Sequence, residues 1–512
     1  MAVQGIRPVA RRHRRARQSR HGTGWQVSAA PLVLAIDQGT TNTKAVLVDA
    51  SGRINARASA PLTTSYPNPG WAEQSAEAIW DSVRKVIAEL APQAGGVVAI
   101  SLANQRETLV LWDAETGKPV APAIIWQCRR SAADCARLHA EGHDTRVVEL
   151  TGLGINPLFP ASKLGWAMRN IPGVADLAAQ DRLRAGTVDA WLLWNLTGGA
   201  SFLTDHSNAS RTQLFDTDKL EWSAELCELF GAPIGALPRP VASDAEFGLT
   251  ADGATALPAG IAIRAMMGDS HAALYGHGVR APGPVKATFG TGSSLMTLTP
   301  QRTASRHGLS GTIAWSDRNG TAHALEGNIT VSAQAAAFMA GLLGTGNAQA
   351  LSDLAQTVES AEGVAFVPAL AGLGAPHWDD KATGLVTGMT HGTKPAHLAH
   401  ATFEAIAQQI ADVFAAMELD VGHPLADLRA DGGASGNAFL MQLQADLLDR
   451  PVLRAEVEEV GALGAAAMAF AALGHPAQVA EESTTRFAPN MAPATRENLR
   501  DVWAKAIARA RA

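Results

Sequence analysis

Two segments of the chain share one pattern, in which a short apolar run is followed by a turn rich in glycine and threonine and then by a second apolar run. The first segment spans 32–48, with its polar turn at 37–44. The second spans 284–298, with its turn at 289–294. Each pattern predicts a β-hairpin whose turn exposes backbone N–H groups and hydroxyls with no bulky side chain in the way.

Along the rest of the chain, helix-like spacing of apolar residues alternates with short strand-like runs. Helices are predicted at 75–90, 187–194, 331–343, 351–358, 397–417, 437–448 and 462–473. Buried strands are predicted at 97–102, 261–266, 363–368 and 427–431, and a strand at 109–112 is expected to pair with 97–102 across the corner at 104–107. This alternation predicts an α/β fold in both halves of the chain, with the two hairpins facing each other across a cleft.

The length of 512 residues predicts two large domains, because a single hydrophobic core rarely serves more than about 250–300 residues. We expect a basic, disordered tail at 1–30, an N-terminal domain at 31–276 and a C-terminal domain at 277–512. Hydrophobic residues make up 47% of the chain and charged residues 18%, which is typical of a globular protein. No apolar run approaches the roughly 20 residues needed to span a bilayer, so no membrane partner is expected.

The net charge of −6 includes seven arginines within residues 1–22, a stretch that contains no acidic residue. The remainder of the chain is therefore more acidic than the total suggests, which argues against nucleic acid as a partner. The basic tail lacks the apolar segment of a signal peptide. The three cysteines form no CxxC pair, as expected for reduced thiols in a cytoplasmic protein.

Two aspartates follow predicted strands and are candidates for chemistry. Asp37 precedes the first hairpin turn, where its carboxylate either caps the turn or holds Mg²⁺, while Lys44 across the hairpin could offset phosphate charge. Asp269 follows the strand at 261–266 and is either a helix cap or a general base. Two facing turns that grip a triphosphate, together with one base, are the components that phosphoryl transfer needs.

A third turn, at 431–437, follows a strand and opens a helix. Its glycines either let a ligand approach the helix N-terminus or simply form a strand-to-helix loop. The spacing of Gly432 and Gly433 does not match a dinucleotide-binding fingerprint, and the chain contains no GxxxxGK[ST] motif. The sequence therefore disfavours a Rossmann or P-loop enzyme.

Ordered stretches along the chain match one family, namely 37–41, 104–108, 126–130, 186–189, 204–205 with 208–212, 324–327, 372–376, 384–404 and 431–434. In these stretches, from residue 32 to about 473, the chain resembles the FGGY carbohydrate kinases, and among them most closely the glycerol kinases. The resemblance implies two ribonuclease-H-like domains, of the kind found in actin and hexokinase, that close on ATP and a small polyol or ketose. Relatives of this kind commonly form homodimers or homotetramers, so the same is expected here.

The resemblance also implies roles for individual residues. Those expected to contact the phosphates of ATP are Thr40, Thr41, Asn42 and Lys44 from the first hairpin and Thr291 from the second, with Gly433 and Asn437 beside the adenosine. Asp37 is expected to serve Mg²⁺, and Asp269 to take the proton of the attacking hydroxyl. Arg106, Glu107 and Trp126 are expected to hold the acceptor, since Arg and Glu bond vicinal hydroxyls and an indole covers a carbon chain.

Three positions of the acceptor site depart from the glycerol kinase pattern. Leu158, Ser270 and Ser294 stand where a tyrosine, a glutamine and a phenylalanine are usual. Smaller side chains should enlarge the pocket and remove contacts to hydroxyls, so we expect an acceptor longer than glycerol, such as a tetritol or a ketose of four or five carbons, with glycerol as the alternative. Two other classes stay open at this point: a non-catalytic, actin-like ATP-binding protein and an ATPase without an acceptor.

Overall fold

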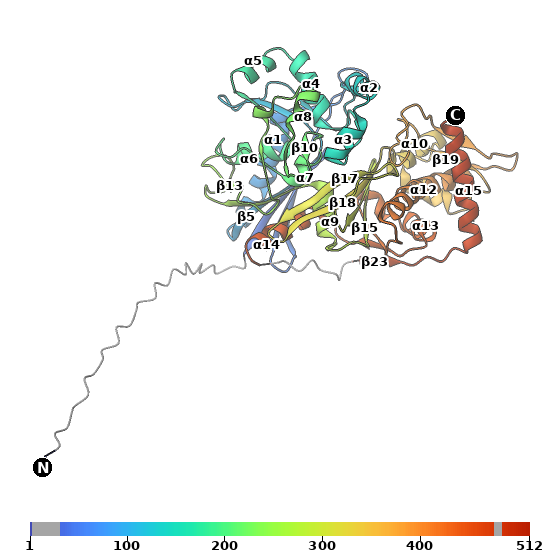
Figure 1. Ribbon diagram of the computed structural model, residues 1–512. Coiled ribbons are helices and arrows are strands. Elements are labelled where there is room, and N and C mark those ends of the chain that lie inside the picture. The colour runs from blue at the N-terminus through green and yellow to red at the C-terminus, as the bar shows by residue number, and fades with distance from the viewer. Residues whose placement is uncertain (3–30, 476–483) are drawn as a thin grey trace.

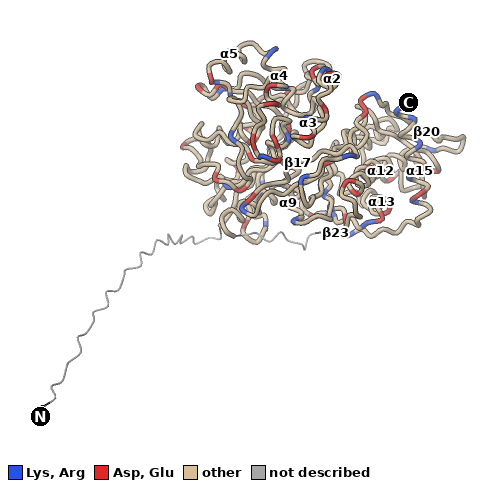
Figure 2. Tube along the Cα trace, viewed as in Figure 1, with Lys and Arg blue, Asp and Glu red and all other residues tan. Residues whose placement is uncertain are grey.

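The computed structural model describes residues 1–2, 31–475 and 484–512. It shows two lobes side by side, which we call the first lobe (31–276) and the second lobe (285–455 with 484–512) (Figure 1). Nearly all of the predicted basic tail at 1–30 lies outside the described residues. In the described part, no helix combines the length and the apolar character needed to cross a membrane. Basic and acidic residues are interspersed over both lobes (Figure 2).

Each lobe is built on one large mixed sheet, and the two sheets share a central arrangement. The first sheet has the order β13-β14-β5-β1-β2-β3, and the second has the order β17-β18-β16-β15-β21-β22-β23. The strands of the first sheet are β1 (Leu32–Gln38), β2 (Asn42–Asp49), β3 (Ile54–Pro61), β5 (Val97–Asn104), β13 (Gly248–Leu249) and β14 (Ala262–Gly268). Those of the second are β15 (Val285–Phe289), β16 (Ser293–Thr299), β17 (Ser310–Asp317), β18 (Gly320–Ile329), β21 (Leu428–Asp431), β22 (Val452–Ala455) and β23 (Thr484–Phe487).

Both predicted hairpins are present and occupy equivalent places. In the first sheet β1 pairs antiparallel with β2 and parallel with β5. In the second, β15 pairs antiparallel with β16 and parallel with β21. Because the carboxyl end of the first hairpin strand leads directly into the turn, each lobe presents one glycine-threonine turn at the same edge of its sheet.

The predicted pairing of the strand at 109–112 is wrong. That segment forms β6 (Val110–Asp113), which pairs with β8 (Leu183–Gly186) and not with β5. Both edges of β5 are occupied, by β1 and β14, so no position is left for a third neighbour. The remaining short strands form two-stranded pairs: β4 (Glu73–Gln74) with β7 (Ala123–Ile124), β9 (Leu203–Asp205) with β12 (Arg239–Val241), β10 (Phe215–Asp216) with β11 (Glu221–Trp222), and β19 (Ala365–Val367) with β20 (Leu385–Thr387).

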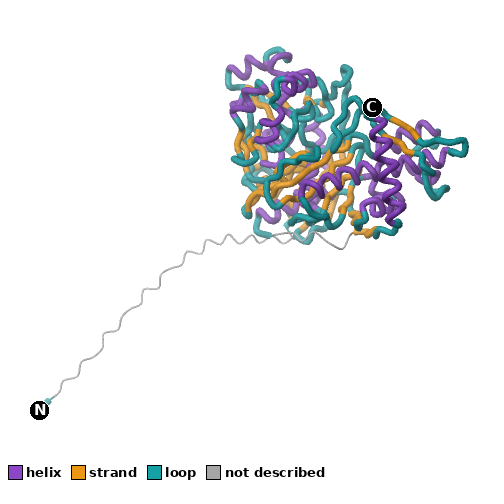
Figure 3. The backbone as a smooth tube through the Cα atoms, turned by 45° about the vertical axis from the view of Figure 1, so that its right-hand side comes forward, coloured by secondary structure: helices purple, strands orange, loops and turns teal. Residues whose placement is uncertain are grey.

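All seven predicted helices are confirmed, and helices flank the strands in both lobes (Figure 3). The confirmed helices are α1 (Ala76–Leu90), α6 (Val188–Leu196), α10 (Ala333–Leu343), α11 (Ala348–Ala355), α12 (Pro395–Val421), α13 (Ala438–Leu448) and α14 (Val460–Ala472). The others are α2 (Ala132–Ala140), α3 (Asp144–Thr151), α4 (Pro160–Asn170), α5 (Val174–Ala179), α7 (His206–Ala209), α8 (Ala224–Phe230), α9 (Asp269–Gly276) and α15 (Pro493–Ala510).

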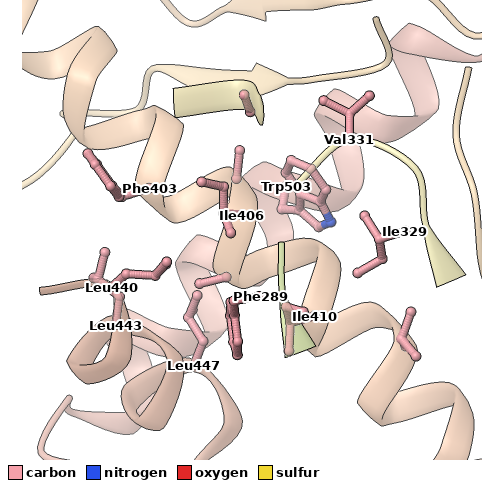
Figure 4. Packing of buried hydrophobic residues seen from close by; sticks show 14 of the residues in the cluster. Phe289, Ile329, Val331, Phe403, Ile406, Ile410, Leu440, Leu443, Leu447 and Trp503 are labelled. Atoms are coloured by element: carbon pink, nitrogen blue, oxygen red, sulfur yellow. The ribbon is translucent and has the colours of Figure 1, made fainter. Parts of the chain in front are cut away.

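The core of the second lobe lies between its sheet and the helices α12, α13 and α15. Phe289 from β15, Ile406 and Ile410 from α12, and Trp503 from α15 are all buried there (Figure 4). Burying an aliphatic or aromatic side chain of this size contributes roughly 1.5–3 kcal/mol. This core holds β15, and therefore the second glycine-threonine turn, on a rigid support.

Helix α14 comes late in the chain but lies against β1, β5, β14 and α9 of the first lobe. Its residues share a hydrophobic cluster with both sheets, from Val33 in β1 to Met296 in β16. The helix approaches α9 so closely that a Cβ atom on Gly464 would stand 1.8 Å from the carbonyl oxygen of Ala272. A side chain has no room at this crossing, which explains the glycine and fixes the strand ends that carry the site.

Candidate active site

The first hairpin turn is exposed and is tied to the predicted acceptor side of the cleft. Its backbone closes through a hydrogen bond from the Gly39 N–H to the carbonyl of Asn42, at 3.0 Å. Thr41 and Asn42 are exposed, as a ligand-binding turn requires. The indole N–H of Trp126 donates to Oγ1 of Thr40 at 2.9 Å. A predicted phosphate contact and a predicted acceptor contact are therefore neighbours.

The second turn, at 290–292, lies beside the turn that follows β21. Thr291 is exposed, and its carbonyl accepts the N–H of Ser332 at the start of α10. Gly432 has φ +88° and sits where a Cβ would stand 2.6 Å from the carbonyl of Phe289. Two turns far apart in the sequence thus meet at one edge of the second sheet, so Thr291 and Gly433 share this edge.

Asn437 and Lys44 have partners within the protein. The Asn437 side chain caps α13 by accepting the N–H of Leu440 at 3.0 Å, and its amide donates to Ser352 at 2.9 Å. The ammonium of Lys44 lies 3.6 Å from the exposed carboxylate of Glu458. The cap holds α13 beside the Gly433 turn, whereas the Lys44 pair is at the surface and contributes little to stability.

Asp37 stands at the carboxyl end of β1, against the first turn of α14. A Cβ on Gly461 would lie 3.0 Å from its Oδ2 atom and 3.6 Å from the backbone oxygen of Asp269. No described residue donates a hydrogen bond to the Asp37 carboxylate, which argues against the turn-capping interpretation. Burial first, and then the negative charge of Asp269, raise the pKa of Asp37 from 3.8 to about 7.

These carboxylates form a cluster that suits a divalent cation, because the nearby charges of Lys44 and Lys286 lower the pKa of Asp37 by less than burial and the charge of Asp269 raise it. Asp431 contributes to the raised pKa of Asp37 and is itself held by the imidazole of His277 at 2.7 Å. In the described chain, no group of three or more His, Cys, Asp or Glu side chains could hold a metal by itself. Mg²⁺ normally takes only one or two carboxylates and completes its shell with phosphates and water. The residues present therefore fit Mg²⁺ bound together with a nucleotide.

Asp269 begins α9, at the carboxyl end of β14, and receives an ion pair from Arg106. The distance from Arg106 Nε to Asp269 Oδ1 is 3.1 Å. The Asp269 side chain is 38% exposed, whereas that of Arg106 is only 7% exposed. The carboxylate is thus fixed on its inner side and open on its outer side, as a general base that meets a ligand must be.

Glu107 has a backbone conformation that is rare for its residue type. Its φ is +59°, in the left-handed region that glycine prefers, and such strain clusters at functional sites. The buried ammonium of Lys163, on α4, donates to the carbonyl of Glu107 at 2.7 Å and to that of Leu158 at 2.6 Å. Burial lowers the pKa of Lys163 to about 7. Lys163 therefore joins the backbones of two predicted acceptor residues.

The two serines that depart from the glycerol kinase pattern are in contact. Ser270 Oγ donates to Ser294 Oγ at 3.1 Å, and Ser294 Oγ donates to Glu326 Oε1 at 2.8 Å. Ser270 lies on α9 of the first lobe and Ser294 on β16 of the second. A line of hydroxyls therefore crosses the boundary between the lobes beside Asp269, where two large side chains would otherwise fill the space.

Sequence reasoning assigned no role to three buried charged residues of this site, namely Lys163, Arg211 and Glu326. Arg211 and Glu326 lie in stretches that resemble the family, but their partners come from distant elements. Lys163 lies outside the matching stretches and binds the carbonyl of Glu107, 56 residues earlier in the chain. The available signal was a lone charge directly after apolar residues, as for Glu326 after Ala324 and Leu325. Such a charge must be paired when it is buried, although the sequence does not say with what.

Family models match both parts of the chain. The N-terminal domain of the FGGY family of carbohydrate kinases matches residues 32–276, and the C-terminal domain of the same family matches 285–473. Among similar proteins, an apulose kinase of Pectobacterium atrosepticum is 47% identical over 88% of this chain and 92% of its own length. A glycerol kinase of Symbiobacterium thermophilum is 44% identical over 94% of this chain and 98% of its own.

Solved structures give the same result. A Plasmodium falciparum glycerol kinase with ADP superposes with a TM-score of 0.88 at 29% identity, covering 94% of this chain and 98% of the other. A xylulose kinase of Rhodospirillum rubrum gives a TM-score of 0.80 at 26% identity, over 93% and 98% of the two chains. Fold and relatives define an ATP-dependent kinase of sugars or polyols with the two-domain, actin- and hexokinase-like α/β architecture, which does not support the non-catalytic alternative. The chain belongs to the FGGY family of carbohydrate kinases.

Proposed function

We propose that this kinase transfers the γ-phosphoryl group of ATP to a primary hydroxyl of a sugar or polyol longer than glycerol. The observation that carries the proposal is the pair Ser270 and Ser294, which meet beside Asp269 with a hydrogen bond of 3.1 Å. Larger side chains at these positions would close the pocket around three carbons. Two small hydroxyl side chains leave space for a longer chain and offer it hydrogen-bonding partners.

Asp269 acts as the base in this proposal. Its open carboxylate takes the proton of the acceptor hydroxyl while that oxygen forms a bond to the γ-phosphorus, and the bond from the γ-phosphorus to the β,γ-bridging oxygen breaks to release ADP. Arg106 and Glu107 bind adjacent hydroxyls, and Trp126 covers the carbon chain. Leu158 forms the remaining wall of the pocket.

The nucleotide lies between the two glycine-threonine turns. Thr40, Thr41, Asn42 and Lys44 bind its phosphates from the first lobe and Thr291 binds them from the second, while Gly433 and Asn437 border the adenosine. Asp37 would hold Mg²⁺, which neutralises phosphate charge when it is bound. We further infer domains at 31–276 and 277–512, which agrees with the reach of the two family models, and a homodimer or homotetramer in the cytoplasm.

Comparing kcat/KM across acceptors tests the proposal. Purified enzyme is supplied with ATP, Mg²⁺ and, in turn, glycerol, erythritol, erythrulose, xylulose, ribulose and apulose, the last because of the 47% identical relative named for it. We expect at least one acceptor of four or more carbons to exceed glycerol by at least about tenfold, the scale of discrimination that one lost contact provides. A preference for glycerol with a micromolar KM would contradict the larger pocket.

A further inference from the structure

Glu326 belongs to the second lobe, yet its carboxylate lies among residues of the first. It stands on β18, opposite Met296 of β16 and Ser310 of β17, next to the edge strand β17 of the second sheet. Its side chain has no exposed surface. Since β18 is held on both sides by neighbouring strands, the position of this carboxylate is set by the second sheet as a whole.

Glu326 completes a ring of alternating charges. Its two oxygens pair with Arg106 at 2.7 Å and with Arg211 at 2.8 Å. Arg211 pairs in turn with Glu107 at 2.7 Å, and Glu107 lies 3.9 Å from Arg106. The other three members come from the first lobe, so among these four residues Glu326 alone connects the ring to the second.

The four residues of the ring are buried, so each charge depends on the close position of its partners. The side chains of Arg211 and Glu326 have no exposed surface, and the side chains of Arg106 and Glu107 are almost as well buried. Burial alone would raise the pKa of Glu326, but Arg106 and Arg211 hold it well below its usual range, so the carboxylate is charged. A buried charge that loses its partner is strongly unfavourable, so displacing Glu326 would force both arginines to rearrange.

We propose that Glu326 is a positioning residue through which the second lobe sets the geometry of the acceptor pocket. The inference rests on the proposed function, because it takes Arg106, Glu107 and Asp269 as the groups that meet the acceptor. Arg106 is shared by Glu326 and Asp269, while Arg211 is shared by Glu326 and Glu107. One carboxylate from the second lobe thus orients the base and an acceptor-binding residue together. Acceptor geometry is complete only when the two lobes are in the relative position seen here.

The test is the variant Glu326→Gln, which keeps the shape of the side chain and removes its charge. We expect kcat/KM for the preferred acceptor to fall by about a hundredfold, the scale of a misplacement of about 1 Å in a reacting geometry. The fall should divide between a higher acceptor KM and a lower kcat. The Kd for ADP, measured by calorimetry, should change by less than about threefold, because the ring contacts no predicted nucleotide residue.

Asp412→Asn is the matched control. Asp412 lies on α12, is largely buried, and accepts hydrogen bonds from Arg500 at 2.6 Å and Trp503 at 2.7 Å, neither of which is a predicted acceptor residue or a member of the ring. This variant should lose thermal stability as Glu326→Gln does, but it should keep the acceptor KM and kcat of the parent enzyme. A loss specific to Glu326→Gln supports the positioning role.

Other outcomes overturn it. A folded Glu326→Gln enzyme whose acceptor KM and kcat lie within twofold of the parent values would show that the ring is only structural. If Glu326→Gln does not fold, Glu326→Asp keeps the charge but is one methylene too short to reach both arginines, and the same kinetic loss is expected. If neither folds while Asp412→Asn does, Glu326 serves folding and the proposal fails. The proposed function fails separately, if Asp269→Asn keeps its turnover.

Discussion

The unusual carboxylate of Asp37 predicts that a single substitution stabilises the ligand-free enzyme while it damages function. An aspartate whose pKa is raised from 3.8 in the unfolded chain to about 7 in the native state opposes folding when it is charged. The native state binds this proton more tightly than the unfolded chain does. The free-energy cost of the charged Asp37 to folding is therefore absent below the unfolded pKa, grows as the pH rises, and is complete above about pH 7. At 1.36 kcal/mol for each unit of pKa, the penalty is about 4 kcal/mol at pH 8 and about 1.5 kcal/mol at pH 5.

Asp37→Asn removes the charge and keeps the size of the side chain. Urea denaturation followed by tryptophan fluorescence, in EDTA and without nucleotide, should show the variant to be more stable than the parent enzyme, by more at pH 8 than at pH 5. Its acceptor-dependent turnover should fall by about a hundredfold, since a strained or repulsive site is often retained for function. Mg²⁺ with ADP should stabilise the parent enzyme more than the variant.

Asp113→Asn is the control for this experiment. Hydrogen bonds from Arg182 hold the pKa of Asp113 at about 2, so its contribution is present above the unfolded pKa and is lost only as the pH falls toward 2. This variant should be destabilised equally at pH 5 and pH 8. If Asp37→Asn is destabilised at pH 8, or its stability relative to the parent enzyme is the same at both pH values, the charged Asp37 carboxylate does not oppose folding.

Two further substitutions probe the pocket and the close packing of α14 on α9. Ser294→Phe should lower kcat/KM for the longer acceptor by at least about tenfold and raise the relative preference for glycerol. The control Ser294→Ala, which leaves the space open, should keep the preference for the longer acceptor. An equal loss of kcat/KM for all acceptors in Ser294→Phe would contradict the larger pocket. Gly464→Ala should destabilise the protein by about 1–3 kcal/mol or more, because its Cβ would stand 1.8 Å from the carbonyl of Ala272. Gly341→Ala on α10 has nothing within 4 Å of the added atom and should be neutral or slightly stabilising by thermal denaturation; equal effects of the two substitutions would refute the close crossing.

The predictable part of this fold is what local patterns encode. The hairpins and the seven helices follow from apolar spacing and turn chemistry that lie within a few residues of one another. The partner of β6 could not be read in this way, because it depends on β5 being enclosed by β1 and β14, which are remote in sequence. The same limit applied to α14, whose apolar sequence indicates burial without showing that it lies against the first sheet.

In the candidate site, too, the residues with a local signal could be predicted and those defined by distant partners could not. Asp37, Asp269 and Arg106 could be identified because they follow strands or lie in recognisable stretches. Glu326 and Arg211 could not be given a role from the sequence, because Arg211 forms ion pairs with both Glu326 and Glu107. Glu107 is more than a hundred residues away from either of them. Which distant buried charges pair is determined by how the two lobes assemble, and no periodic pattern in the sequence indicates it.

In the proposed mechanism, Asp269 meets an acceptor alcohol and the terminal phosphate of ATP in one crevice. ADP formation measured with and without acceptor, in the parent enzyme and in Asp269→Asn, tests this most directly. We expect ADP to form only when a sugar or polyol is present. Asp269→Asn should lower this rate by at least about a hundredfold and leave ADP binding unchanged. Acceptor-independent ADP formation, or full turnover without the Asp269 carboxylate, would contradict the proposed mechanism.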